Sequence, residues 1–155
     1  MNANMKSEMK IHSMIMIIIS IIAGLLSTMN VFVANVNDIR FHINDFYMAF
    51  LMAGWMLLLQ SIIFYDKIEN VNTLILISII IIIFTFIAIR TQFLISDDQY
   101  LNGMIPHHSM AILMSEQINK KTKNPEIKQL ANHIIKHQQE EINKINNLLK
   151  INKNI

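Results

Sequence analysis

The chain has 155 residues, of which 53% are hydrophobic and only 15% are charged, and its net charge is +2. A soluble domain of this size rarely carries so few charges, so the composition favours a membrane protein, and the weak positive charge argues against nucleic-acid binding. The chain contains no cysteine, which excludes disulfides, thiolate ligands and cysteine nucleophiles, so any soft metal ligand has to be a methionine thioether.

Three apolar segments have the length of a membrane span, at residues 14–33, 46–65 and 72–89. About 20 helical residues cross the roughly 30 Å hydrocarbon core of a bilayer. Inside the bilayer a helix satisfies its own backbone, so we predict three transmembrane helices. The first apolar segment is longer than the core of a signal peptide, so we expect it to be retained as an anchor.

Positive charges near the ends of the spans predict the orientation of the protein in the membrane. Lys6, Lys10 and Lys67 would lie on one side of the membrane, and Arg40 and Arg90 on the other. By the positive-inside rule, the N-terminus is then cytoplasmic and the C-terminal tail extracytoplasmic, or periplasmic, by a margin of one charge. We expect an integral membrane protein with residues 1–95 as its anchor.

Residues 96–155 form the second predicted domain, which reads as two helices joined by the polar turn NKKTKN. The second helix begins with Asn124 as N-cap, Pro125 in the first helical position and Glu126 in the first turn, and runs to about Lys150. Pro106 either kinks the first helix or begins it. Two helices of about 60 residues cannot close a core alone. We expect a dimeric four-helix bundle or, alternatively, packing on the membrane helices.

Helical periodicity places one carboxylate, two imidazoles and two thioethers of the first tail helix along one stripe or at its edge. These residues are Asp97, His107, His108, Met104 and Met114. The predicted inward stripe of the second helix comprises Ile127, Leu130, Ala131, His137, Gln138, Glu141, Ile145, Leu148 and Leu149, with His133 at its edge. A carboxylate buried in such a stripe needs a cationic partner, either a protonated histidine or a metal ion.

Thioether and imidazole ligands together suit Cu(I), and Ag(I) by the same softness argument. Zinc more often recruits cysteine or three histidines. His133 and His137 are spaced to chelate a metal, but the segment HIIKH lacks the glutamate of a zinc protease, and the Glu-x-x-His pairs of di-iron bundles are missing from the chain. A hydrogen-bonded histidine in a helical core remains the alternative interpretation.

Three methionines in the second span recur every four residues along one helix face. These are Met48, Met52 and Met56. They could form a thioether ladder for a soft cation, although packing or lipid contact is the simpler interpretation because methionine fills gaps well.

The segment DDQYLNGMIPHHSMAILM, followed by PEIK-x-LA and by II-x-x-Q-x-x-EI, resembles the domain of unknown function 305 family over about residues 96–149. The resemblance implies a ferritin-like helical fold and an association with copper, often outside the cytoplasm. Carried over position by position, it selects Asp97, Met104, His107, His108, Met114, Gln138 and Glu141. The family commonly has a methionine four residues after that glutamate, where this chain has Ile145.

The sequence therefore predicts an all-α, membrane-anchored protein that binds copper for sequestration or handling, and not an enzyme. The predicted ligands are His107, His108, Met104 and Met114. Asp97 and Glu141 would orient the imidazoles, and His133, His137 and Gln138 would assist. The expected partners are the bilayer, a second copy of the chain and a metal-donor or metal-acceptor protein. The alternative function is a structural or interaction module, in which the same polar side chains form a buried network that fixes bundle assembly.

Overall fold

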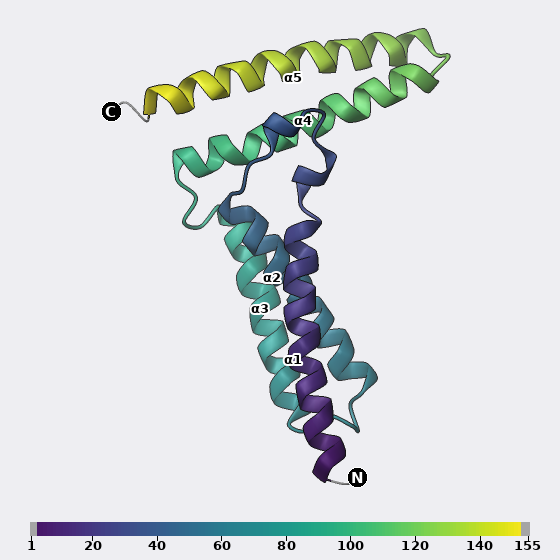
Figure 1. Cartoon of the computed structure of the whole chain (residues 1–155), viewed down its shortest axis with the longest axis vertical. Helices are drawn as coiled ribbons and strands as arrows, with labels where there is room; N and C mark the ends of the chain where they lie inside the picture. Colours follow the sequence, from purple (N-terminus) through teal and green to yellow (C-terminus); the bar gives the residue numbers. More distant parts are fainter. Residues whose placement is uncertain (1–2, 153–155) are drawn as a thin grey trace. The chain divides into compact units, whose positions relative to one another are not determined.

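The computed structural model describes the backbone of residues 3–152 and the side chains of Glu8 and residues 11–152. Within that range the chain is helical without a strand, so the predicted all-α class is confirmed. The elements are α1 (Ala3–Leu26), the 3₁₀ turns η1 (Met29–Phe32) and η2 (Val36–Asp38), α2 (Ile43–Ile63), α3 (Val71–Thr91), α4 (Asp97–Lys121) and α5 (Pro125–Asn152) (Figure 1). The side chains of Lys6 and Lys10, two of the charges that predict the orientation, lie outside the described residues.

The chain divides into two compact units. The first unit contains α1, α2 and α3. The second contains α4 and α5 together with the segment Met29–His42, which connects α1 to α2 in sequence. This connecting segment therefore belongs to the same unit as α4 and α5, whereas the helices on either side of it, α1 and α2, belong to the first unit.

Three apolar stretches are long and apolar enough to cross a membrane, namely Ile11–Phe32, Ile43–Ile63 and Val71–Thr91. Large apolar side chains such as Ile18, Ile80 and Phe84 are more than half exposed on these helices. A soluble monomer rarely exposes a continuous apolar surface of that kind. These three helices indicate an integral membrane protein, as the composition predicts.

Small residues let the membrane helices approach closely, with α2 packed against both α1 and α3. A Cβ atom added to Gly24 of α1 would lie 2.6 Å from the Cα atom of Ala49 on α2, which is far too close. Helix association in a bilayer depends on such close packing, because lipid tails are as apolar as leucine and supply no hydrophobic driving force. Gly24 is therefore required by the contact between α1 and α2.

Several hydroxyl groups inside the first unit donate to nearby backbone carbonyls. Ser20 donates to Met16 at 2.7 Å, and Thr85 donates to Ile81 at 2.7 Å. At one end of the bundle the hydroxyl of Tyr47 donates to the carbonyl of Phe93, also at 2.7 Å. These bonds remove the cost of placing polar groups in a water-poor environment.

The helix of the first span ends earlier than predicted, at Leu26 rather than near Val33, although the apolar stretch continues through η1. The side chain of Asn30 explains the change of direction. Its amide donates to the Arg40 carbonyl at 2.8 Å, and its carbonyl accepts from the Arg40 amide at 2.8 Å. This pair of bonds closes residues 30–40 into a loop, which is incompatible with a helix continuing outward.

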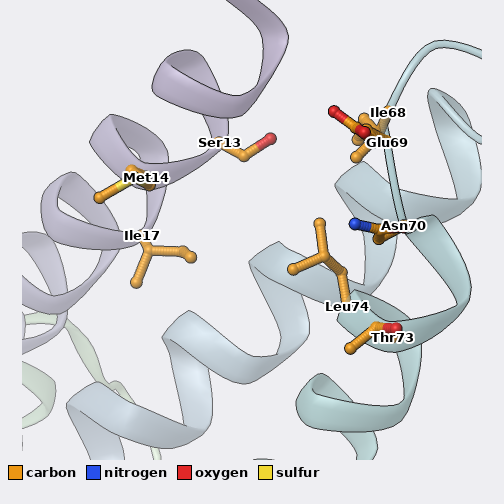
Figure 2. A pocket seen from close by; sticks show the side chains of 8 residues that line it. All are labelled: Ser13, Met14, Ile17, Ile68, Glu69, Asn70, Thr73 and Leu74. Carbon is orange, nitrogen blue, oxygen red and sulfur yellow. The ribbon is translucent and has the colours of Figure 1, made fainter. Parts of the chain in front are cut away.

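A cavity of about 300 Å³ opens in the first unit between α1 and the turn that leads into α3. Figure 2 shows Ser13 of α1 and Glu69 of the turn pointing toward this space, with Leu74 of α3 beside it. The lining holds one carboxylate and no histidine or methionine pair that would suit a metal. This cavity therefore does not match the predicted metal site, whose histidine and methionine ligands all belong to the second unit.

Candidate metal centre

The candidate centre lies on the hairpin of α4 and α5, which run antiparallel and are joined by a short turn (Figure 1). Each helix has a well-defined start. The Ser96 side chain accepts from the Gln99 amide, and the Asn124 side chain accepts from the Glu126 amide. These are N-cap bonds, so the predicted start of the second tail helix at Pro125 is confirmed. Pro106 lies inside α4 and so does not begin a helix.

Hydrogen bonds at both ends of the hairpin fix the register of the two helices. Asn119 donates to Asn132 at 2.6 Å near the turn, and Asn152 donates to Asp98 at 3.1 Å at the open end. Between them the core is built from Ile105 and Ile112 of α4 against Ile142 and Ile145 of α5, with further apolar side chains around it. We call the residues that face each other across this contact the seam. They comprise Leu101, Ile105, His108, Ile112 and Ser115 of α4, and Ala131, Ile135, Gln138, Ile142, Ile145 and Leu149 of α5.

His108 is the polar residue at the centre of the seam, only 9% exposed. Its Nδ1 atom lies 3.4 Å from the Oε2 atom of Glu141 on α5. The two groups are at ion-pair distance, but their geometry is not that of a hydrogen bond, and Nδ1 has no hydrogen-bond partner among the described residues. The structure thus brings together one predicted imidazole and one predicted carboxylate.

Burial lowers the pKa of His108 below its ordinary value, because a charged imidazole loses its hydration there. The carboxylate of Glu141 acts in the opposite direction, and the neighbouring His107 adds to the lowering. The imidazole is therefore mainly neutral at pH 7. Neutral imidazole is the form that binds a metal ion.

The other three predicted ligands are all more exposed than His108. Met104 packs against the seam core, whereas His107 is exposed and Met114 is 62% exposed. The rings of His107 and His108 are 5.9 Å apart between centroids and inclined at 59°. One chain therefore does not gather its two histidines and two methionines around a single point.

On α5 the inward stripe differs from the one that periodicity predicts. Ile127, Leu130, His137, Glu141 and Leu148 were expected to face inward, but all five are exposed. The prediction was wrong at these positions because α5 has two neighbouring apolar stripes and α4 covers only one of them. Ala131, Ile145 and Leu149 do lie on the covered side, as predicted.

The remaining candidates lie at the surface of the hairpin or close to it. His133 and His137 stack on the exposed side of α5 with ring centroids 4.1 Å apart. Asp97 is exposed in the first turn of α4, and Gln138 is half-buried in the seam. Across the part of the chain that the structure describes, no three histidine, aspartate or glutamate side chains converge on one point.

The sequence pattern of the family described as "Domain of unknown function (DUF305)" matches residues 91–150. The chain belongs to the DUF305 family. It is also 53% identical over 136 residues to "Uncharacterized protein L153" of Acanthamoeba polyphaga mimivirus. The aligned region covers 88% of this chain and 90% of that protein. No solved structure matches the chain.

Within the DUF305 domain, the position where the family resemblance leads us to expect a methionine carries a core side chain. Ile145 is 8% exposed and belongs to the same apolar cluster as Ile105. In this chain the position therefore stabilises the hairpin instead of offering a thioether.

Nothing in the sequence pattern indicates that the DUF305 domain contacts its own upstream segment. Ser109 of α4 is fully buried, accepts a hydrogen bond from the Ala34 amide at 2.9 Å and donates one to Asp38 Oδ2 at 2.7 Å. A Cβ atom added to Gly103 would meet the ring of His42 at 3.3 Å. The segment Met29–His42 therefore covers the side of α4 that carries Gly103 and Ser109.

The three methionines of the second span belong to the first unit and lie on the exposed surface of α2. Met48 is 54% exposed, and Met52 and Met56 are also exposed. They lie along a side of α2 that neither α1 nor α3 covers, which is consistent with contact to lipid.

Proposed function

We propose that this protein is a membrane-anchored metal-binding protein that binds Cu(I), or Ag(I) by the same chemistry, for sequestration or handling at the extracytoplasmic face. The ligands are His107, His108, Met104 and Met114. The N-terminus is cytoplasmic and the hairpin extracytoplasmic, or periplasmic. The protein binds and passes on a metal without catalysing a reaction, so it needs a metal-donor or metal-acceptor protein as partner.

The observation that carries this proposal is the buried His108 beside Glu141. A neutral imidazole with a carboxylate near Nδ1 resembles the arrangement in which a second residue orients a metal-binding histidine. Met104 lies one turn from His108 and contributes a thioether to the same part of the hairpin. In a chain without cysteine, this combination favours a soft monovalent cation over zinc.

A structural role is the second candidate, and the position of His108 on the seam favours it. A single polar residue in an apolar helix interface can fix the register of pairing at some cost in stability. On that reading the pair of His108 and Glu141 selects one alignment of α4 against α5, and no metal takes part.

His107 separates the two functions because it is exposed, so its removal costs the fold little. The experiment is an anaerobic Cu(I) titration of the full chain in detergent, in competition with a chromophoric chelator. We expect His107→Ala to weaken Cu(I) binding by at least about tenfold with helicity unchanged, since losing a ligand or its support typically costs 10- to 100-fold. His12→Ala is the matched control, an exposed histidine on α1 outside the hairpin.

The structural role predicts a different pattern. In that case wild-type protein binds no Cu(I) tightly, His107→Ala changes nothing, and His108→Ala alters only the melting temperature. This pattern would overturn the metal-binding proposal.

A further inference from the structure

The hairpin has a second apolar face beside the seam. It is formed by the residues that precede seam residues by one position, and we call it the open face. On α4 it comprises Tyr100, Met104, His107, Ala111 and Met114, with Ile118 in the same register; Met104 is half-buried and also contacts the seam core. On α5 its apolar members are Leu130, Ile134 and Leu148, with Ile127 and Ile151 in the same register, and its polar members are the exposed His137, Glu141 and Lys144. Tyr100, Leu130 and Ile151 are each more than half exposed.

The two halves of the open face lie on the same side of the hairpin. The residue one position before a seam residue points about 100° away from it around the helix axis. Because α4 and α5 run antiparallel, with Asn119 bonded to Asn132 and Asn152 to Asp98, these rotations carry both stripes to the same side. The opposite side of α4 carries Ser109, which the chain's own segment covers.

The open face of α4 is complementary to itself when two copies run antiparallel. Its heptad-like spacing extends from Asp97 to Lys121 and is the same read from either end. Antiparallel pairing places Asp97 opposite the partner's Lys121, Tyr100 opposite the partner's Ile118, and Met104 opposite the partner's Met114. Parallel pairing would instead place the two copies of Asp97 together and the two copies of Lys121 together, which repels. Charge complementarity therefore selects a second copy of this chain, related by a two-fold axis near Ser109.

We propose that a second copy docks on the open face in this antiparallel register, and that the metal site is completed between the copies. Met104 of one chain then meets the partner's Met114, with His107 one helical turn along. The exposed Met114, which does not converge with the other ligands within one chain, thereby gains a thioether neighbour. The metal part of this inference rests on the proposed function, whereas the docking part does not.

The natural absence of cysteine makes the register directly testable in the full chain. Tyr100→Cys and Ile118→Cys chains with different tags are coexpressed and treated, in membranes with a chelator present, with a short bismaleimide. We expect a mixed cross-linked dimer. Like positions should not link, because 18 residues of antiparallel helix separate them by about 27 Å. Gln117→Cys, an exposed neighbour turned away from the open face, replaces Ile118→Cys as the control.

The docking proposal is overturned if the mixed cross-link does not form or if like positions cross-link to each other. The first result is also the one expected if a lipid surface, and not a second copy, covers the open face. The site between the copies is tested with a heterodimer of one Met104→Leu chain and one Met114→Leu chain, isolated by its two tags. Each homodimer lacks one thioether at both sites. The heterodimer keeps one site intact and lacks both thioethers at the other.

We expect tight Cu(I) binding to be lost in both homodimers and to return in the heterodimer at about half the wild-type number of sites. A heterodimer no better than the homodimers overturns the shared site but leaves the docking intact. If the mixed cross-link forms but the wild-type chain binds no Cu(I) tightly, the proposed function is overturned instead, and the docking stands.

Discussion

The contact between α4 and the segment before α2 gives the sharpest prediction about the fold. Ser109→Ala removes the hydroxyl that accepts from the Ala34 amide and donates to the carboxylate of Asp38 at 2.7 Å. A hydrogen bond to a charged group contributes about 1.5–3 kcal/mol. Ala34 is exposed, so its freed amide can bind water and adds little to the cost. We therefore expect a loss of about 2 kcal/mol in the free energy that holds the segment on α4.

Hydrogen exchange of the full chain in detergent, measured by mass spectrometry, reports this loss as faster exchange of the amides in the segment Met29–His42. A change of about 2 kcal/mol corresponds to about 30-fold faster exchange of the Ala34 amide, because each 1.4 kcal/mol is a factor of ten. Ser115→Ala is the matched control, since Ser115 is also a buried serine of α4 but lies on the seam. If Ala34 exchanges at the wild-type rate in Ser109→Ala, or if Ser115→Ala accelerates it equally, the reasoning is refuted.

Two further predictions concern packing and pH. Gly24→Ala should lower the melting temperature in detergent more than Gly54→Ala does, because overpacking at Gly24 costs about 1–3 kcal/mol of stability. The new Cβ would lie 2.6 Å from the Ala49 backbone, whereas at Gly54 it would meet movable side-chain atoms at 3.0 Å or more. Equal effects of the two substitutions would contradict the close contact between α1 and α2. In metal-free buffer, the free energy of unfolding should fall as the pH drops below the ordinary histidine pKa of about 6.5, because the folded state holds the pKa of His108 down and the unfolded state binds the extra proton. His108→Gln should flatten that slope in denaturant titrations, and an unchanged slope would refute the assignment.

The sequence alone determined the elements of this protein. Uninterrupted apolar runs of membrane length could only become helices in a bilayer, and α2 and α3 begin and end within a few residues of the predicted spans. Local capping chemistry likewise set the start of α5 at Pro125, because Asn124 satisfies an amide of the first turn. These features depend on interactions within a few residues, so they can be read from the chain directly.

Tertiary structure decided which side of each helix is covered. The stripes of α5 that contain Gln138 and His137 are about 100° apart and both apolar enough to be buried, so periodicity could not choose between them. The contact with α4 covers the first and leaves the second exposed, which also separates the buried His108 from the exposed His107. The bond from Ser109 to Asp38 spans 71 residues of sequence, and no local pattern announces a contact of that range.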